Sequence, residues 1–243
     1  MALFIMGACF SERLIFPYRG CSYDKDLMGL DFIDSKDGHK IAISYQQASQ
    51  EKCLILYFHG NGEDLGHLTG LLEFLNQQGY STLALDYRGY GLSTGTPTEK
   101  TTYQDADLLY EKAQDLGYHP KDIVLWGRSV GSGPAVDLSS RRQAKALVLE
   151  SPFATAFTVL TRIPILPFDK FNNLEKIAKV KCPLFIVHGD KDRIIHHRHS
   201  EKLLNAYTGV KERYLIPGAG HNDLWAHDLN PLLDSLSRFI VAN

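Results

Sequence analysis

The sequence is poor in the residues that define several large classes of protein. Its 243 residues include four cysteines, Cys9, Cys21, Cys53 and Cys182, which are widely scattered and form no C-x-x-C pair. This spacing argues against a disulfide framework and indicates free thiols in a reducing compartment. Lysine and arginine total 26 against 28 acidic residues, so there is no basic field for nucleic acid. We therefore expect a cytoplasmic protein with small neutral or weakly charged partners and no nucleic acid.

Long apolar runs are also missing. The most apolar end, residues 1–10 (MALFIMGACF), is too short to span a bilayer and lacks the basic residues of a signal peptide. The M-G-A-C that ends at Cys9 weakly resembles a lipoprotein cleavage site, but the missing positive charge argues against one. We expect no transmembrane segment and interpret these residues as a strand or a surface-packing arm. Peripheral contact with a membrane is left open, as is the oligomeric state.

Motifs for metal ions are absent as well, and there is no H-E-x-x-H. His196, His197 and His199 lie close together in the chain, but Arg193 and Arg198 beside them disfavour a cation. No cysteine or pair of acids completes a known ligand spacing. We expect a solvated helix start at these histidines and no metal.

A nucleotide cofactor is the next alternative, although there is no P-loop. Glycines at 60, 62 and 66 follow a predicted strand and open a helix, and Asp86 ends the next strand, where a ribose-binding acid could lie. Glu63 and Asp64 would repel a pyrophosphate at that helix start, and no lysine or arginine compensates. We therefore expect no cofactor.

Alternating strand and helix patterns are what the sequence does contain. With 44% hydrophobic and 22% charged residues, it suits one α/β domain over residues 1–243 with a large core. The alternation is typical of an approximately eight-stranded, mostly parallel sheet with helices on both faces. Strands are predicted at residues 30–33, 40–45, 53–58, 81–85, 123–126, 146–149, 184–187 and 213–216. Helices are predicted at 65–75, 101–116, 130–140, 198–207 and 231–241, with Gly79, Gly117 and Gly209 as C-terminal caps.

One segment, residues 152–183, interrupts this alternation. It contains two prolines and a high density of apolar side chains: Phe153, Phe157, Leu160, Ile163, Ile165, Leu166, Phe168 and Phe171. A long apolar segment inside a compact domain is typical of a lid or a binding wall, and the alternative is a helical excursion that completes the core. We predict a small cap, with Phe153, Phe157 and Leu160 as substrate contacts.

The stretch G-R-S-V-G at residues 127–131 places Ser129 between a predicted strand and a predicted helix. Gly127, Gly131 and Gly133 permit a sharp turn and close helix packing, which would expose the serine hydroxyl. A serine alcohol is a weak nucleophile, so it needs a histidine base that is oriented by an acid. The motif alone does not decide whether Ser129 is a nucleophile or a small turn residue.

Acidic and histidine side chains follow two later strands. The strand at 184–187 leads into H-G-D-K-D, and the strand at 213–216 leads into P-G-A-G-H, which ends at His221. Because the carboxyl ends of parallel strands meet at one edge, these side chains and Ser129 should lie together. Residue chemistry alone does not separate Asp190 from Asp192 as the acid. His221 is preferred over His188, which follows a strand beside the acid loop, and over His227, in a helix-like stretch.

Four signatures in order give the chain a resemblance to the α/β-hydrolase superfamily over about residues 13–241. They are Y-F-H-G-N-G at 57–62, D-Y-R-G-Y-G-L-S at 86–93, G-R-S-V-G at 127–131, and H-G-x-x-D followed by G-A-G-H. The chain looks most like a small-cap subgroup that includes eukaryotic protein depalmitoylases, on E-R-L-I-F, D-Y-R-G-Y-G and S-P-F. We expect no counterpart of the cysteine-rich N-terminal anchor of those depalmitoylases, so we do not carry their membrane-bound substrates over to this chain.

This resemblance implies a serine hydrolase that acts on carboxylic esters or thioesters through a Ser-His-Asp triad. The H-G-x-x-D pattern implies Asp192 as the acid beside Ser129 and His221. The backbone amide of Val130, directly after the nucleophile, should donate to an oxyanion, and the resemblance implies the amide of Asn61 as the second donor. Peptide or amide hydrolysis and a non-catalytic binding protein on the same fold remain the alternatives.

Overall fold

The computed structural model describes residues 12, 15–17, 20–161 and 170–242. The chain divides between Tyr118 and His119 into two compact units. Eight strands are found in the described residues, four in each unit, and most of the strand pairs within the units are parallel. The predictions for the N-terminal residues 1–10, Cys9 among them, and for residues 162–169 lie outside the described part of the chain.

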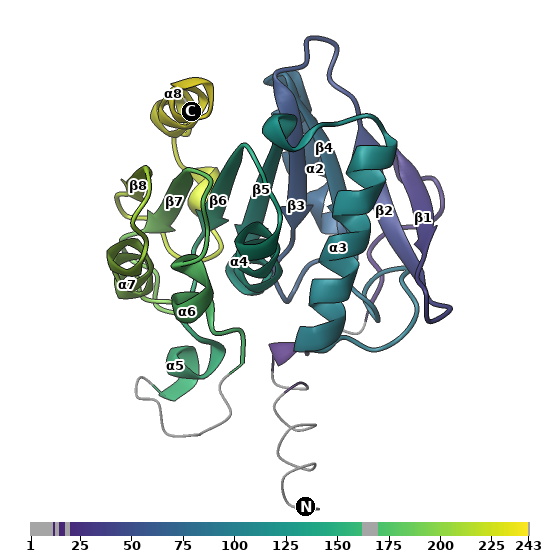
Figure 1. The fold of residues 1–243 in the computed structure, drawn as a ribbon, viewed down its shortest axis with the longest axis horizontal. Helices are drawn as coiled ribbons and strands as arrows, with labels where there is room; N and C mark the ends of the chain where they lie inside the picture. Colours follow the sequence, from purple (N-terminus) through teal and green to yellow (C-terminus); the bar gives the residue numbers. More distant parts are fainter. Residues whose placement is uncertain (1–11, 13–14, 18–19, 162–169, 243) are drawn as a thin grey trace, which may run out of the picture. The chain divides into compact units, whose positions relative to one another are not determined.

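The first unit is a mixed sheet with one helix on each face. Its strands are β1 (Leu30–Asp34), β2 (Lys40–Gln46), β3 (Cys53–Phe58) and β4 (Tyr80–Leu85). Their order is β1-β2-β4-β3, with β3 and β4 parallel and the other two pairs antiparallel. Helices α2 (Leu65–Gln77) and α3 (Glu99–Asp115) cover opposite faces (Figure 1). Every residue of β3 and β4 is buried, as expected for strands covered on both sides.

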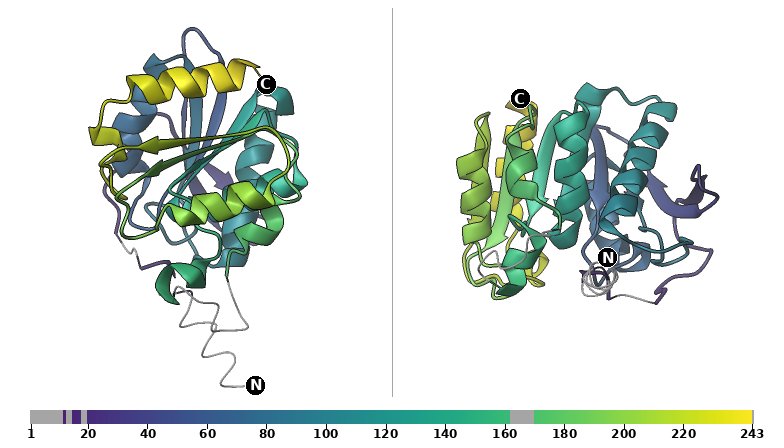
Figure 2. Two further views of the ribbon diagram at one scale, coloured as in Figure 1. Left: turned by 90° about the vertical axis from the view of Figure 1, so that its left-hand side faces the viewer. Right: turned by 60° about the horizontal axis from the view of Figure 1, so that its bottom comes forward.

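The second unit is a parallel sheet with strands in chain order. Its strands are β5 (Ile123–Arg128), β6 (Ala146–Glu150), β7 (Leu184–Gly189) and β8 (Lys211–Ile216). Its longer helices are α4 (Ser132–Arg141), α7 (Arg198–Ala206) and α8 (Asn230–Ala242). Helices α7 and α8 lie on opposite faces of this sheet (Figure 2). Short 3-10 turns complete it at η1 (Pro120–Asp122), η2 (Ser129–Gly131) and η3 (Leu224–Ala226).

All eight predicted strands and five predicted helices are confirmed, with two local differences. Helix α4 begins at Ser132, two residues later than predicted, because η2 first turns the chain sharply after β5. Gly79 and Gly117 have φ angles of 87° and 94°, as helix C-terminal glycines commonly do. The prediction for Gly209 is wrong: α7 ends at Ala206, and a Cβ on Gly209 would lie 2.3 Å from the hydroxyl of Tyr207. Gly209 therefore makes room for that buried ring.

The segment 152–183 contains two short helices that the sequence did not predict, α5 (Ala156–Thr161) and α6 (Asn173–Ile177). Phe153 and Phe171 are buried and pack edge to face, with ring centroids 6.2 Å apart. The side chains of Phe157 and Leu160 lie outside the described part of the structure. Both described ends of the segment therefore contribute to the core of the second unit.

The cysteines and the helix lengths bear on two of the sequence predictions. Cys21, Cys53 and Cys182 are present as thiols, with Cys21 exposed and the other two buried. Among the residues with described coordinates, no helix combines the length and the apolar character needed to cross a membrane.

Candidate active site

Ser129 lies on a strained turn between β5 and α4. Its φ angle is 51°, in the left-handed region that a residue with a side chain rarely adopts. The close approach of the two elements requires glycine at position 127, where a Cβ would lie 2.4 Å from the carbonyl oxygen of Gly131 and 2.7 Å from Cβ of Ala135. The turn places the hydroxyl of Ser129 at the carboxyl end of β5, with 9% of the residue exposed.

The three residues predicted as nucleophile, base and acid lie together in the second unit. His221 Nε2 is 3.0 Å from Ser129 Oγ, and His221 Nδ1 is 2.7 Å from Asp192 Oδ2. An ionised carboxylate can only accept hydrogen bonds, so His221 donates from Nδ1. Its Nε2 is then the unprotonated nitrogen, which can accept the proton of the serine hydroxyl.

Asp192 is held as a carboxylate by the donors around it. Burial acts to raise its pKa, but hydrogen bonds from His188 and His221 and from the amide of Ile195 outweigh burial and hold the pKa well below its usual range. Its Oδ1 atom accepts the amides of Ile194 at 2.9 Å and Ile195 at 2.8 Å. Asp192 therefore stays ionised, with its Oδ2 atom directed at His221.

Asp190, the alternative acid, has a different partner. Its Oδ1 atom accepts the backbone amide of Gly218 at 2.7 Å, and the amide of neighbouring Lys191 donates to the carbonyl of Ala219 at 2.9 Å. A Cβ on Gly189 would lie 2.3 Å from that same carbonyl oxygen. The turn after β7 thus contacts the backbone of the loop after β8, and Asp190 contributes one of these contacts.

His188 is fully buried behind the acid. Its Nε2 atom lies 2.7 Å from the carbonyl oxygen of Ile195 and 3.2 Å from Asp192 Oδ2, and its Nδ1 atom lies 2.9 Å from Ser200 Oγ. None of these three contacts involves Ser129. His188 supports the acid loop, in keeping with the preference for His221 as the base.

The H-G-N-G loop at residues 59–62 belongs to the first unit and has a shape that is set by its own neighbours. The hydroxyl of Tyr87 donates to the carbonyl of His59, and that of Tyr90 donates to the carbonyl of Asn61, each at 3.1 Å. The amide of Gly60 donates to Glu63 at 2.8 Å. Both tyrosines of D-Y-R-G-Y-G are therefore structural residues that position this loop.

The two predicted oxyanion donors fall in different units, Asn61 in the first and Val130 in the second. Val130 is the second residue of η2, just before α4. Backbone amides at the start of a helix have no hydrogen-bond acceptor within that helix. Their joint action on one oxygen stays a prediction.

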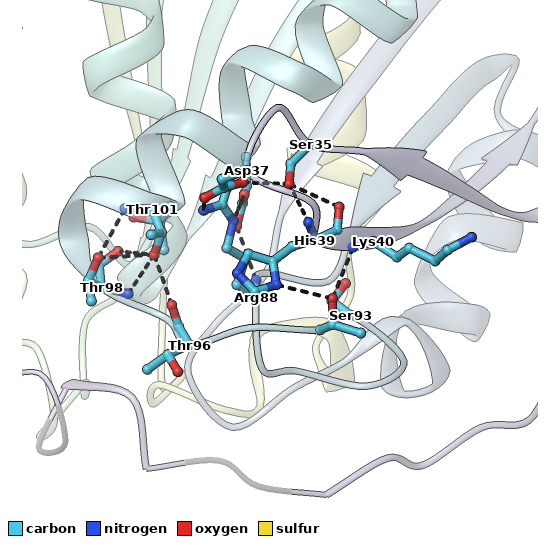
Figure 3. A network of polar contacts seen from close by, with 12 residues as sticks. Ser35, Asp37, His39, Lys40, Arg88, Ser93, Thr96, Thr98 and Thr101 are labelled. Carbon is cyan, nitrogen blue, oxygen red and sulfur yellow. Dashed lines mark hydrogen bonds and ion pairs between the residues drawn. The ribbon is translucent and has the colours of Figure 1, made fainter.

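The remaining polar residues of D-Y-R-G-Y-G also bind within the first unit. Arg88 is buried and donates to Asp105 Oδ1 at 2.9 Å. It also donates to Asp37 Oδ2 at 2.6 Å (Figure 3). Asp86 accepts the amide of Leu65 at 2.9 Å and a hydrogen bond from the hydroxyl of Tyr23. These contacts join the turn after β4 to α2, α3 and the β1–β2 connection.

The start of α2 is occupied by the chain itself. Asp64 is its N-terminal cap and accepts the amide of His67 at 3.2 Å and the amide of Ser22 at 2.6 Å. The carboxylate therefore takes the position where a nucleotide pyrophosphate would bind.

The histidines near α7 are only partly available to a ligand. His199 Nδ1 accepts the amide of Ala154 at 3.1 Å. Burial, together with nearby positive charge, lowers the pKa of His199 to about 4. Within the described ranges, no group of three His, Cys, Asp or Glu side chains is arranged to hold a metal ion.

Sequence reasoning missed a buried ion pair beside the site. Arg128, between Gly127 and Ser129, donates from Nε to Glu150 Oε1 at 2.9 Å. Glu150 is the last residue of β6 and is fully buried. The available signal was a charged residue at the carboxyl end of an apolar strand, A-L-V-L-E.

Comparisons with known proteins agree with this fold. The family profile described as "Serine aminopeptidase, S33" matches residues 49–166. Human alpha/beta hydrolase domain-containing protein 17B is 31% identical over 235 residues, which covers 95% of this chain and 80% of the relative. The mouse protein 17C is 33% identical over 243 residues, covering 96% of this chain and 74% of the relative.

Among solved structures, the chain resembles Est1E from Butyrivibrio proteoclasticus with ferulic acid bound. The TM-score is 0.71 at 22% identity, and the match covers 87% of this chain and 98% of Est1E. The α/β-hydrolase fold and the family predicted from the four signatures are thereby confirmed. The chain belongs to the α/β-hydrolase family that includes alpha/beta hydrolase domain-containing proteins 17B and 17C.

Proposed function

We propose that the protein is a cofactor-independent serine hydrolase that cleaves carboxylic esters or thioesters through an acyl-enzyme. The observation that carries the proposal is the hydrogen-bonded series Ser129–His221–Asp192, with distances of 3.0 Å and 2.7 Å, on a strained turn at the end of β5. A nucleophile, a base and an orienting acid in this geometry suit acyl transfer.

In this mechanism Ser129 Oγ bonds to the acyl carbon while its proton passes to His221 Nε2. The carbon–oxygen or carbon–sulfur bond to the leaving group then breaks, and the leaving group takes that proton. Water then attacks the acyl carbon of the acyl-enzyme and gives a proton to His221. The bond between the acyl carbon and Ser129 Oγ breaks, and Ser129 Oγ takes that proton from His221. Asp192 holds the imidazole and stabilises its cationic form, and the amides of Val130 and Asn61 would bind the oxyanion.

The segment 152–183 is proposed as a small cap that contacts the acyl group, with Phe153, Phe157 and Leu160 as its contact residues. Phe153 comes three residues after the end of β6, at the sheet edge that also carries Ser129 in the second unit. Its burial against Phe171 favours a role in shaping a wall over a role as an exposed contact. A small acylated molecule is the proposed substrate class.

Peptide or amide hydrolysis is the second candidate, and the description of the matching family profile, a serine aminopeptidase, favours it. Both reactions use the same acyl-enzyme and differ in the leaving group. A binding protein without activity is disfavoured, because the three triad side chains and the elbow glycine at position 127 are all present.

The test is labelling with an alkyl fluorophosphonate, with mass spectrometry to locate the adduct and Ser129→Ala as the control. We expect an adduct on Ser129, and hydrolysis of p-nitrophenyl butyrate that Ser129→Ala loses. A matched butyryl thioester and a butyryl p-nitroanilide then separate the esterase, thioesterase and amidase alternatives. Folded protein without an adduct and without hydrolysis would support the binding-protein alternative instead.

A further inference from the structure

We propose that Arg128 and Glu150 position His221 against Ser129 by binding the loop that carries the base. This inference rests on the proposed function, because it concerns the geometry of the same site. Arg128 Nη2 donates to the backbone carbonyl of His221 at 3.3 Å and to Asn222 Oδ1 at 3.2 Å. Its Nε atom donates to Glu150 Oε1 at 2.9 Å. One guanidinium therefore joins β5, β6 and the loop after β8.

Glu150 anchors the arginine and also binds the loop directly. The indole Nε1 of Trp225, four residues after His221, donates to Glu150 Oε1 at 3.1 Å. Trp126 on β5 approaches Glu150 Oε2 at 3.4 Å, and the rings of Trp126 and Trp225 have centroids 6.1 Å apart. A buried carboxylate with several donors is held firmly, because each lost donor leaves part of its hydrogen-bonding capacity unsatisfied in a medium of low dielectric.

The loop after β8 is thus held on two sides. Residues 216–220 bind the turn after β7, where the amide of Lys191 donates to Ala219 and Asp190 accepts the amide of Gly218. From His221 onward the contacts are with the other side, through Arg128 and Glu150. The imidazole of His221 lies at the junction of these two sets of contacts, between its acid and its nucleophile.

The position of Arg128 in the chain gives its contact a specific consequence. It directly precedes Ser129, so its bond to the carbonyl of His221 links the backbones of nucleophile and base. The Oγ–Nε2 distance of 3.0 Å depends on how these two backbones are spaced. Proton transfer requires that distance, and a displacement of about 1 Å can lower a rate by about 100-fold.

Arginine suits this task better than lysine. Its planar group offers separate nitrogens to Glu150 and to the His221 loop, whereas a lysine has one ammonium on a flexible stem. A buried ion pair is also weak evidence for stability, because apolar residues of similar volume often replace one without loss. We therefore assign this pair a role in geometry.

The experiment measures kcat and KM for p-nitrophenyl butyrate per active site, after titration of reactive sites with a fluorophosphonate. The variants are Arg128→Met, Arg128→Lys, Glu150→Gln and the double variant Arg128→Met with Glu150→Gln. Arg141→Met is the matched control, because Arg141 is the last residue of α4 and forms an ion pair with Asp137 of the same helix at 2.7 Å.

For Arg128→Met we expect kcat per titrated site to fall by about 10- to 100-fold, with KM changed by less than about threefold. Arg128→Lys should recover little of the kcat that Arg128→Met loses, and Glu150→Gln should also lower kcat. The double variant should be no worse than Arg128→Met, because both residues act through one set of contacts. Arg141→Met should keep kcat within about twofold.

If Arg128 and Glu150 only stabilised the fold, the variants would lower the fraction of sites that react with the fluorophosphonate and leave kcat per titrated site unchanged. That result would overturn the inference. Arg128→Lys and Glu150→Gln keep a polar group at each position, so they give the same comparison if Arg128→Met does not fold. Failure of the proposed function would look different, because wild-type protein would then carry no adduct on Ser129 at all.

Discussion

Replacing Asp192 by asparagine should abolish most activity by reversing the tautomer of His221. The reason lies in the two backbone amides of Ile194 and Ile195, which both donate to Oδ1 at 2.9 Å and 2.8 Å. An asparagine at this position would keep its carbonyl oxygen toward these amides. Its NH2 group would then occupy the Oδ2 position, 2.7 Å from His221 Nδ1. His221 would have to accept there and carry its proton on Nε2, facing Ser129.

The magnitude follows from the alternative orientation of the asparagine. Turning the amide round would restore the active tautomer but would leave two buried amides facing an NH2 group, at about 1 to 3 kcal/mol for each lost bond. The variant also loses the charge that stabilises the imidazolium, worth about 1.5 to 3 kcal/mol for a hydrogen bond to a charged group. These terms add to about 3.5 to 9 kcal/mol, which corresponds to a fall in kcat of at least about 300-fold.

The assay is hydrolysis of p-nitrophenyl butyrate, with circular dichroism to show that the variant is folded. Asp190→Asn is the matched control, because its amide oxygen can still accept the amide of Gly218, and we expect kcat within about threefold of wild type. If Asp192→Asn kept more than about a tenth of the activity, the tautomer argument would be refuted. Equal losses in both variants would also contradict the assignment of Asp192 as the acid.

Two further predictions concern stability against pH, measured by urea unfolding from pH 4 to 8. The pKa of His199 falls to about 4 through burial, so its folded form stays neutral while the unfolded form gains a proton near pH 6.5. The contribution of His199 to the free energy of unfolding should therefore decline as pH falls from about 6.5 to 4, and His199→Asn, which can still accept the amide of Ala154, should remove that contribution. Burial raises the pKa of Asp86 to about 7, and nearby Asp64 adds to this, so the contribution of Asp86 should decline as pH rises from about 4 to 7 and should partly offset that of His199. Asp86→Asn should remove that second dependence, and an unchanged slope in either variant would contradict the corresponding argument.

Much of the fold could be predicted because strands and helices follow local patterns. Fully buried strands such as β3 and β4 appear as short, continuous apolar runs, and the leucine stripe of α2 repeats at three and four residues. The segment 152–183 was harder, since α5 and α6 are short and depend on packing that no periodicity records.

The candidate site was accessible from sequence for a topological reason. Ser129, Asp192 and His221 each follow a strand of one parallel sheet, and the carboxyl ends of such strands share an edge. The order of the motifs along the chain therefore carries information about which side chains can meet. Distances between them are a property of the folded loops.

The sequence by itself predicted the α/β class, the eight strands, and Ser129 and His221 at the carboxyl edge of the sheet, with either Asp190 or Asp192 as the acid. The tertiary structure alone decided that Asp192, with Asp190 bound to Gly218, contacts His221, because that choice depends on how two loops close on each other. It also brought Arg128 and Glu150 to the loop of His221. Local sequence patterns record the burial and backbone preference of each residue, whereas contacts between residues about 90 positions apart exist only after the sheet has formed.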